Sequence, residues 1–507
     1  MFAKSCALAL VLLASGAVAS PALVRGADED EAVPDLDKAT HPSSRFIKVA
    51  GSKGTGLQTL TILPDGHIVG LVALGRYEAV GGGKNAKKKP QPELRLYDAE
   101  GTEVRKWTLP FNGHSVAAAP DGSILVAGEA KIARYSAEGN LLREAELSYV
   151  ADVLKNKEKL TELAEGRRES MVEMYERYAT EEFKEQIDEF KKKAADLDKQ
   201  IEELKAKEPA KKVDGEKAKD KDAKPEPAKD ADSKPKTAAA ANPLLQVVQA
   251  LFGGGEEEQE LMLEEDFALD VEEVDPNATP LQKLERQRKI VGNNLKFLEQ
   301  QSQVYAKEAE SAKNRPVQEY IDEIVEGASR VYSIACNDKE VFVASGELTG
   351  YGYSLWRMGT EFDEPTRVIK KLSGCCGQID VQAKGDVLFV ADNTQHAVTK
   401  YDREGKKLAS FGETGRVSEG LKFGGCCNPM NCRVDKQGFV YTAESEGVVK
   451  KFSEDGAFLA LVGVAKLKGG CKNVAVAVSP DAKRVYFCDQ PGSRIVILEP
   501  KDADERK

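Results

Sequence analysis

A phrase of short strands and turns recurs along this chain, and a recurring phrase restricts the fold to repeat architectures. Each copy begins with an apolar strand and a turn of the Pro-Asp-Gly type, and a second strand then ends in Ala plus an acidic or small residue. A third strand with an aromatic residue leads through a Glu-Gly or Asp-Gly turn into a fourth. The copies are centred on Pro64-Asp65-Gly66, Pro120-Asp121-Gly122, Gly385, Gly438 and Pro480-Asp481, and a weaker copy covers 331–369.

Six units of roughly 40–55 residues fit the four-stranded blades of a β-propeller. One unit cannot bury both faces of its small sheet, so the units are expected to stack around a shared axis in an all-β, six-bladed ring. The last copy has three strands and ends at Glu499, whereas 45–50 precedes the first copy as a strand without a partner. We predict that this N-terminal strand completes the last blade and removes a free sheet edge. A pair of β-sandwiches is the alternative fold.

The repeat resembles that of the NHL-repeat propellers at Asn428-Pro429, at the Asp-Gly turns and at Val390-Ala391-Asp392. The resemblance covers two blocks of the chain. Residues 44–148 would hold the closing strand and blades 1–2, and residues 327–500 would hold blades 3–6. No single activity is implied, because the family includes binding modules, sensor domains, lyases and hydrolases.

Residues 149–326 interrupt the repeat and carry the periodicity of helices. From Phe183 to Leu204 apolar residues alternate at spacings of four and three, which is the pattern of a coiled-coil seam. Thr279-Pro280-Leu281-Gln282 is typical of a helix start with a capping box, and Arg288 interrupts the seam that follows. Between the helices, 205–242 is rich in Lys, Ala, Pro and Asp and is predicted to be disordered. The helices are expected to form either an antiparallel hairpin or an arm that pairs with a partner, including a second copy.

Residues 1–19 have the pattern of an export signal. Lys4 supplies a basic start, Cys6 to Leu13 is an apolar run, and Ala17-Val18-Ala19 matches a cleavage site. The run is shorter than the about 20 residues of a membrane-spanning helix, and an uncleaved anchor is the alternative. After cleavage, a linker at 20–43 and a tail at 501–507 flank the propeller. The mature protein is expected to be periplasmic or secreted, without a membrane span.

Nine cysteines occur, and cleavage of the signal removes Cys6. An even number in an oxidising compartment favours disulfides. The disulfide candidates are Cys336, Cys375, Cys376, Cys426, Cys427, Cys432, Cys471 and Cys488. The five that precede the innermost strand of a blade are expected around the mouth of the central channel: Cys375, Cys376, Cys426, Cys427 and Cys471. Cys432 and Cys488 are expected in the core.

Three interpretations of the rim cysteines remain open. Cross-blade or vicinal disulfides would staple the ring, a thiolate site would bind a metal or cluster, and an exposed pair would exchange disulfides. The spacing lacks the C-x-x-C pairs of zinc sites, yet this cluster is the candidate metal site of the chain. No other cofactor is predicted.

Three further residues are candidates for the channel. His114 precedes an inner strand, and Asp380 and Arg433 occupy inner-strand positions where they would line the channel as a charged pair, structural or catalytic. The residues outline no catalytic set, so the leading hypothesis is a non-enzymatic exported scaffold that binds a protein or other ligand at the propeller mouth, with the helical arm contacting a protein. A metal-binding or redox protein and an NHL-type lyase or hydrolase are the alternatives. The formal net charge of −11 argues against a nucleic-acid partner.

Overall fold

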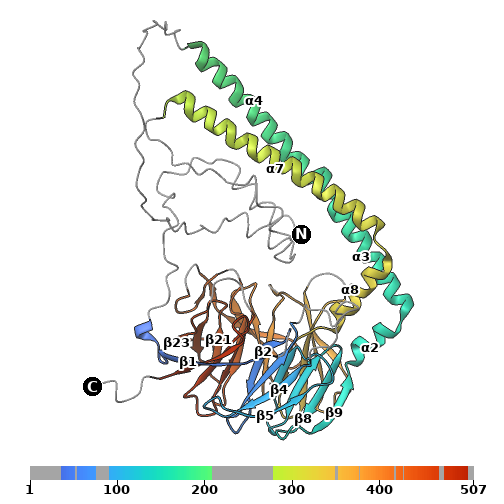
Figure 1. Cartoon of the computed structure of the whole chain (residues 1–507), viewed down its shortest axis with the longest axis vertical. Helices are drawn as coiled ribbons and strands as arrows, with labels where there is room; N and C mark the ends of the chain where they lie inside the picture. The colour runs from blue at the N-terminus through green and yellow to red at the C-terminus, as the bar shows by residue number, and fades with distance from the viewer. Residues whose placement is uncertain are drawn as a thin grey trace, which may run out of the picture. The chain divides into compact units, whose positions relative to one another are not determined.

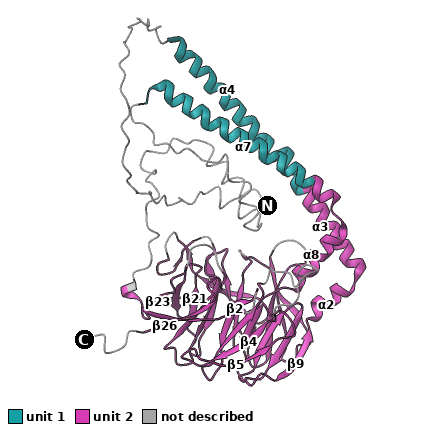
Figure 2. Cartoon of the chain, viewed as in Figure 1, with its two compact units in different colours: residues 1–29, 174–309 teal, residues 30–173, 310–507 magenta. Residues whose placement is uncertain are grey.

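The structure is a computed structural model that describes residues 36–51, 54–75, 91–207, 278–348, 352–375, 377–415, 418–425, 427–467 and 473–500. These residues form two compact units (Figure 2). One lies within 174–309, and the other comprises the described residues of 30–173 and 310–507. The predicted signal and tail therefore lie outside the described residues, as do Cys376, Cys426 and Cys471.

Six four-stranded antiparallel sheets, numbered here in chain order, make up the larger unit (Figure 1). Sheet 1 contains β2 (Gly56–Ile62), β3 (Ile68–Ala73), β4 (Glu93–Tyr97) and β5 (Glu103–Thr108). Sheet 2 contains β6 (Ser115–Ala118), β7 (Ile124–Gly128), β8 (Lys131–Tyr135) and β9 (Leu141–Glu146). Sheet 3 contains β10 (Val331–Cys336), β11 (Glu340–Gly346), β12 (Tyr353–Gly359) and β13 (Thr366–Leu372).

The remaining sheets come from the C-terminal part of the chain. Sheet 4 contains β14 (Asp380–Lys384), β15 (Val387–Asp392), β16 (Ala397–Asp402) and β17 (Lys407–Phe411). Sheet 5 contains β20 (Asn431–Val434), β21 (Val440–Ala443), β22 (Val448–Phe452) and β23 (Phe458–Val464). Sheet 6 contains β24 (Val474–Val478), β25 (Val485–Asp489), β26 (Arg494–Glu499) and β1 (Ser43–Lys48). A short parallel pair, β18 (Glu413–Thr414) and β19 (Lys422–Phe423), lies between sheets 4 and 5 in the sequence.

The innermost strands of the six sheets contact one another in a cycle, in the order β2, β6, β10, β14, β20, β24 and β2 again. Small sheets stacked around such a hub form a β-propeller, and the prediction of that fold is confirmed. The outer strand of sheet 6 comes from the N-terminal side: β1 pairs with β26 from Ser43 opposite Glu499 to Lys48 opposite Arg494.

Burial is highest in the second strand of each sheet and lowest in its outer strand. In sheet 1 every residue of β3 is buried, whereas β5 is largely exposed, and sheet 2 repeats this gradient from β7 to β9. The second strand is covered on both faces by neighbouring sheets, which explains its near-continuous apolar sequence. The turns follow the predicted chemistry: Gly122 has a φ of 85°, and Asp121 accepts the backbone N–H of Ser123 at 2.9 Å.

Helices join sheet 2 to sheet 3, as the interruption of the repeat predicted. They are α2 (Ser148–Lys155), α3 (Lys157–Arg177), α4 (Phe183–Lys207), α7 (Pro280–Asn314) and α8 (Val317–Ser329), with one wider turn, η2 (Tyr178–Glu182). Within the larger unit, α3 and α8 share a small core of Leu160, Ala164, Tyr320 and Ile324. None of the described helices combines the length and the apolar character that crossing a membrane requires.

In the smaller unit, α4 and α7 run antiparallel. Three ion pairs join the helices: Lys205–Glu285 and Asp198–Arg288, both at 2.7 Å, and Lys191–Glu299 at 3.1 Å. From pair to pair the residue number falls along α4 and increases along α7, as in an antiparallel pair. Ala194 and Leu197 pack against Val291 between the helices. Arg288 interrupts the apolar pattern because it pairs with Asp198 across the hairpin.

The start of α7 has the predicted capping box. Gln282 Oε1 accepts the Thr279 backbone N–H at 2.8 Å, and Thr279 Oγ1 accepts the Gln282 N–H at 3.2 Å.

Two predicted boundaries need correction. Residues 205–207 belong to α4 rather than to a disordered segment, the rest of which lies outside the described residues. The end of the predicted linker is structured as well, because η1 (Leu36–Lys38) is helical and the Thr40 and His41 backbone N–H groups bond Leu461 and Val462 on β23.

Candidate ligand-binding site at the hub

Side-chain hydrogen bonds join successive inner strands around much of the hub. The acceptors, which we call the hub belt, are Ser115 on β6, Ser333 on β10, Asp380 on β14 and Asn431 on β20. The donors are backbone N–H groups one sheet further on, at Ile334, Val381, Cys432 and Val476, with distances of 3.1, 3.0, 3.1 and 2.9 Å. All four acceptor residues are buried. Inner strands of neighbouring sheets share no backbone ladder, so these bonds satisfy amides that would otherwise be left unpaired.

Asp380 is the charged member of the hub belt. Its Oδ1 accepts the Ser333 hydroxyl at 2.9 Å, and its Oδ2 accepts Arg433 Nη1 at 3.4 Å. Burial raises the pKa of this carboxyl above its ordinary value, and the nearby Arg433 opposes that rise. The structure therefore brings the two predicted channel residues together, and Asp380 has the same joining role as its uncharged equivalents.

Arg433 reaches across the hub. Its Nη2 donates to the backbone oxygen of Leu60 on β2 at 3.5 Å, and its Nη1 also donates to Cys432 O at 3.3 Å. Because β20 and β2 are not neighbours in the cycle of inner strands, the guanidinium lies across the channel between them. A side chain in this position narrows the channel, and we call the cavity that it lines the hub cup.

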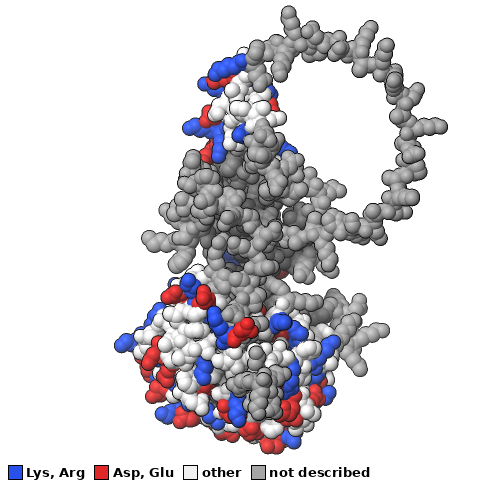
Figure 3. Space-filling view, turned by 90° about the vertical axis from the view of Figure 1, so that its left-hand side faces the viewer, with Lys and Arg blue, Asp and Glu red and all other residues white. Residues whose placement is uncertain are grey.

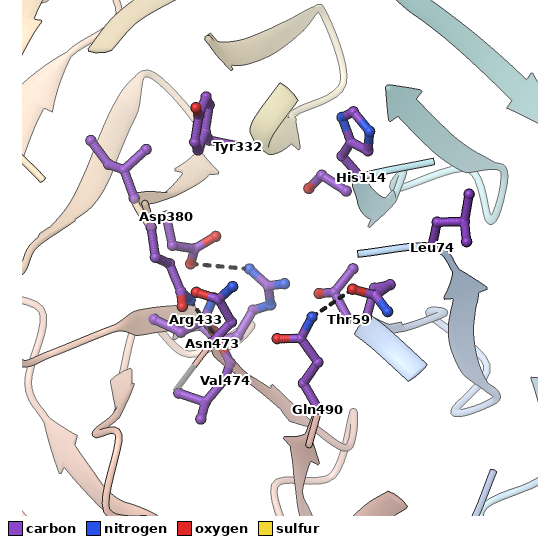
Figure 4. A pocket seen from close by; sticks show the side chains of 14 residues that line it. Thr59, Leu74, His114, Tyr332, Asp380, Arg433, Asn473, Val474 and Gln490 are labelled. Atoms are coloured by element: carbon purple, nitrogen blue, oxygen red, sulfur yellow. Dashed lines mark hydrogen bonds and ion pairs between the residues drawn. The ribbon is translucent and has the colours of Figure 1, made fainter. Parts of the chain in front are cut away.

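The cup has a volume of about 30 Å³, which is room for about two water molecules. All six sheets contribute to its lining, mostly from inner strands and the residues before them, with Leu74 and Gln490 added from the ends of β3 and β25 (Figure 4). The polar lining residues besides the belt and Arg433 are Gln58, Thr59, His114, Tyr332, Gln378, Asn473 and Gln490. Amide side chains predominate, and such groups both donate and accept hydrogen bonds.

Gln378 holds three sheets together at the cup wall. It precedes β14, and its Nε2 donates to Met430 O at 2.9 Å and to Val474 O at 2.8 Å, next to β20 and on β24. The side chain is buried, and its Oε1 has no hydrogen-bond partner among the described residues. Arg433 Nε is likewise buried without a partner there.

His114 lies in the cup lining, as the sequence predicted for a residue facing the channel. Its Nδ1 accepts the Val331 backbone N–H at 3.2 Å, so the neutral ring carries its proton on Nε2. The imidazole thus supports β10 from the cup wall.

Two of the predicted rim cysteines come together beside the cup. Cys375 and Cys427, which precede β14 and β20, have their sulfur atoms 2.9 Å apart. Cys427 is buried and Cys375 is half-buried. Asn393 anchors Cys375 by accepting its N–H at 2.8 Å and donating to its carbonyl at 3.2 Å. The other three rim cysteines lie outside the described residues.

Cys336, Cys432 and Cys488 are free thiols in this structure, and their role as disulfide partners stays a prediction. They pack in three different hydrophobic clusters, which keeps their sulfurs apart. Burial raises the pKa of the Cys336 thiol to about 12 and raises those of Cys432 and Cys488 as well. The prediction that Cys432 and Cys488 occupy the core is confirmed.

Sequence reasoning missed Gln378 and three members of the hub belt. A signal for part of the belt was present, because Ser115 and Asn431 occupy the same place in the repeat, one residue before Val116 and Cys432. Gln378 has no counterpart of that kind, since its role depends on contacts with two other sheets.

The fold and the site define a β-propeller with a polar hub joined by side chains. The sequence matches no family model and no curated protein. Among solved structures, an inactive virginiamycin B lyase from Staphylococcus aureus with quinupristin matches at a TM-score of 0.36 and 8% identity, covering 90% of this chain and 99% of that one. A streptogramin B lyase matches at 0.34 and 7%, covering 90% and 98%. The calcium-binding protein regucalcin from Agrobacterium tumefaciens matches at 0.37 and 12%, covering 90% and 94%.

Proposed function

We propose that this protein is an exported, six-bladed propeller scaffold that binds a ligand in the hub cup without transforming it. The pattern of residues 1–19 supports export, and the pairing of β1 with β26 supports a ring closed by the N-terminal strand. The repeat supports kinship with the NHL-repeat propellers, a family that includes binding modules.

Two buried polar atoms of residues that line the cup carry this proposal. Gln378 Oε1 is a buried acceptor and Arg433 Nε a buried donor, and neither has a partner among the described residues. Leaving such a group unpaired costs about 1–3 kcal/mol. A ligand that donates to one and accepts from the other would recover this energy on binding.

The size and chemistry of the cup define the ligand group. A cavity of about 30 Å³ admits only the tip of a larger molecule. A hydroxyl or carboxamide both donates and accepts, so a partner protein's side chain of this type is the proposed occupant. On the face of the larger unit drawn in Figure 3, described cations and anions are interspersed, so recognition is assigned to hydrogen bonds in the cup rather than to a charged patch on that face.

The helical hairpin is the proposed arm for contact with a protein. Ile290 on α7 is 47% exposed and leaves a large apolar side chain on the surface of the hairpin. Self-association through this helix is the alternative, and light scattering of the mature chain and of Ile290→Lys distinguishes the two. A dimer in the first and a monomer in the second would favour self-association.

Thermal unfolding of the mature chain with small amides and alcohols tests the cup. The melting temperature of the wild type is expected to rise with at least one of these compounds. Arg433→Lys, which keeps the charge but removes Nε, should lose the response. Arg357→Lys is the matched control, because Arg357 pairs with Glu404 outside the cup. Equal responses in all three proteins, or chemical conversion of the compound, would overturn the proposal.

A second function is supported by one observation, the approach of the Cys375 and Cys427 sulfurs to 2.9 Å. Such a pair suits disulfide exchange or the binding of a thiophilic metal. Metal analysis of untagged protein separates these uses from the scaffold, because stoichiometric iron, copper or zinc would favour the metal site.

A further inference from the structure

Two rim cysteines from different sheets are held at bonding range by the fold itself. Cys375 and Cys427 are 52 positions apart in the sequence, yet their sulfurs are 2.9 Å apart. A disulfide has a sulfur–sulfur distance of about 2.05 Å, so bond formation requires a sulfur movement of less than about 1 Å.

Buried amide side chains fix the backbone on both sides of this pair. Asn393, which is 1% exposed, bonds both the N–H and the carbonyl of Cys375. Next to Cys427, fully buried Asn428 donates to Gly424 O at 2.7 Å and accepts the Ser445 N–H at 2.8 Å. Support of this kind holds the two sulfurs close together.

The same supports continue into the cup wall. The Gln378 N–H donates to Cys375 O at 3.2 Å, and Asn393 Nδ2 also donates to Gln378 O at 3.1 Å. Gln378 in turn donates to Met430 O, three residues after Cys427. A covalent link between the two sulfurs would therefore tie together the two backbone segments that Gln378, a residue of the cup lining, already joins by hydrogen bonds.

The two thiols differ in access to solvent. Cys427 is 1% exposed, whereas Cys375 is half-buried. A reagent in solution is therefore expected to reach Cys375 before Cys427.

We propose that Cys375 and Cys427 form a reversible disulfide between sheets 4 and 5 that rigidifies the wall of the hub cup. A small-molecule disulfide, RSSR, is the oxidant. The Cys375 thiolate attacks one sulfur of RSSR, which forms a mixed disulfide and releases RS⁻. The Cys427 thiolate then attacks Cys375 Sγ, which forms the protein disulfide and releases the second RS⁻. The two thiol protons and two electrons leave in two molecules of RSH, and an excess of RSH reverses the sequence.

Peptide mapping without reduction tests the bond in the full mature chain after treatment with oxidised glutathione. Cys376 and Cys426 adjoin the pair in sequence, so assignment uses two double variants. Cys376→Ser/Cys426→Ser should retain a cross-link between the peptides of sheets 4 and 5, with the loss of two hydrogens. Cys375→Ser/Cys427→Ser should lose it. The reverse result, or no cross-link in either variant, would overturn the proposal.

Hydrogen exchange tests the effect on the cup wall. In Cys376→Ser/Cys426→Ser, oxidation is expected to slow exchange at 377–379 by about tenfold, because the bond suppresses local opening. The amides of β3, in sheet 1, serve as an internal control and should not change. A cross-link without slower exchange would overturn the effect on the cup. The effect on the cup matters for ligand binding only if the proposed function holds. Neither measurement uses a ligand, so the disulfide proposal can fail while the proposed function stands, and the reverse.

Discussion

The segments that lead into the inner strands of sheets 2 and 5 make the same backbone hydrogen bond but carry different side chains. The N–H of His114 donates to Ala127 O at 2.8 Å, and the N–H of Met430 makes the equivalent bond to Ala443 O at 2.9 Å. The next residue in each sheet, Ser115 or Asn431, belongs to the hub belt. The two segments therefore occupy equivalent positions of the repeat.

The residue that lies five positions before the first core residue of the inner strand differs between the two sheets. Five residues before Val116, sheet 2 has Phe111, which packs in the core of sheets 1 and 2. Five residues before Cys432, sheet 5 has Cys427, whose sulfur contacts that of Cys375. The repeat folds with an aromatic ring at this position, so the fold itself does not require sulfur there. Cys432 fills the place of Val116 as a small apolar group, whereas Cys427 is a candidate for chemistry.

The largest expected effect is the change in the free energy of unfolding when Cys375 and Cys427 form a disulfide. A bond that joins residues 52 positions apart should stabilise the oxidised chain by about 4 kcal/mol, because it restricts the unfolded state. Denaturant unfolding of the wild type with and without reductant measures this difference. Cys427→Ser should show no such difference, and Cys336→Ser, which removes a thiol from the interior, should behave as the wild type.

Removal of the aromatic ring from sheet 2 should rank next. Phe111→Ala is expected to lower the free energy of unfolding by about 3 kcal/mol, because a buried ring is replaced by a cavity. In reduced protein, Cys427→Ala should cost only about 1 kcal/mol, since a single small atom is lost. Equal costs in reduced protein would show that sulfur has a packing role here and would remove the contrast between the sheets.

The hub belt provides a third test. Asp380→Ala removes the acceptor of the Cys432 N–H and the carboxylate that pairs with Arg433, and it should cost about 2 kcal/mol. Asp380→Asn should cost less, because Asn431 already performs the same joining role in sheet 5 with an amide. If both variants cost the same, the hydrogen bond to β20 contributes little.

The smallest effect is a pH dependence. The folded-state pKa of Asp380 is raised by burial, so its contribution to stability is complete below its ordinary pKa and is lost as the pH rises through the folded value. As the pH rises above about 4, the wild type should therefore lose stability relative to Asp380→Asn. Unfolding curves of both proteins at several pH values measure the trend, and a trend of opposite sign would contradict the assignment.

Local signals in the sequence were sufficient for much of the fold. Alternating apolar residues and Asp-Gly turns located the strands, and the Thr279–Gln282 pattern marked the start of α7. These features depend on residues close together in the chain, so one sequence carries them.

The site was only partly accessible to the same reasoning. Asp380, Arg433 and His114 could be placed at the channel because the repeat fixes their register. The reach of Arg433 to Leu60 and of Gln378 to two other sheets could not, because such contacts depend on how separate sheets close around the hub. Contacts between residues so far apart in the sequence produce no periodic pattern in it.

The central claim is that the hub belt joins the inner strands from β6 to β24 while three of its members, Ser115, Asp380 and Asn431, line the cup. Hydrogen exchange of individual amides tests it most directly, at Ile334, Val381, Cys432 and Val476. These four should exchange as slowly as amides in the middle of β7 or β15, because each donates to a buried side chain. Rapid exchange at these four positions while β7 and β15 stay protected would contradict the account.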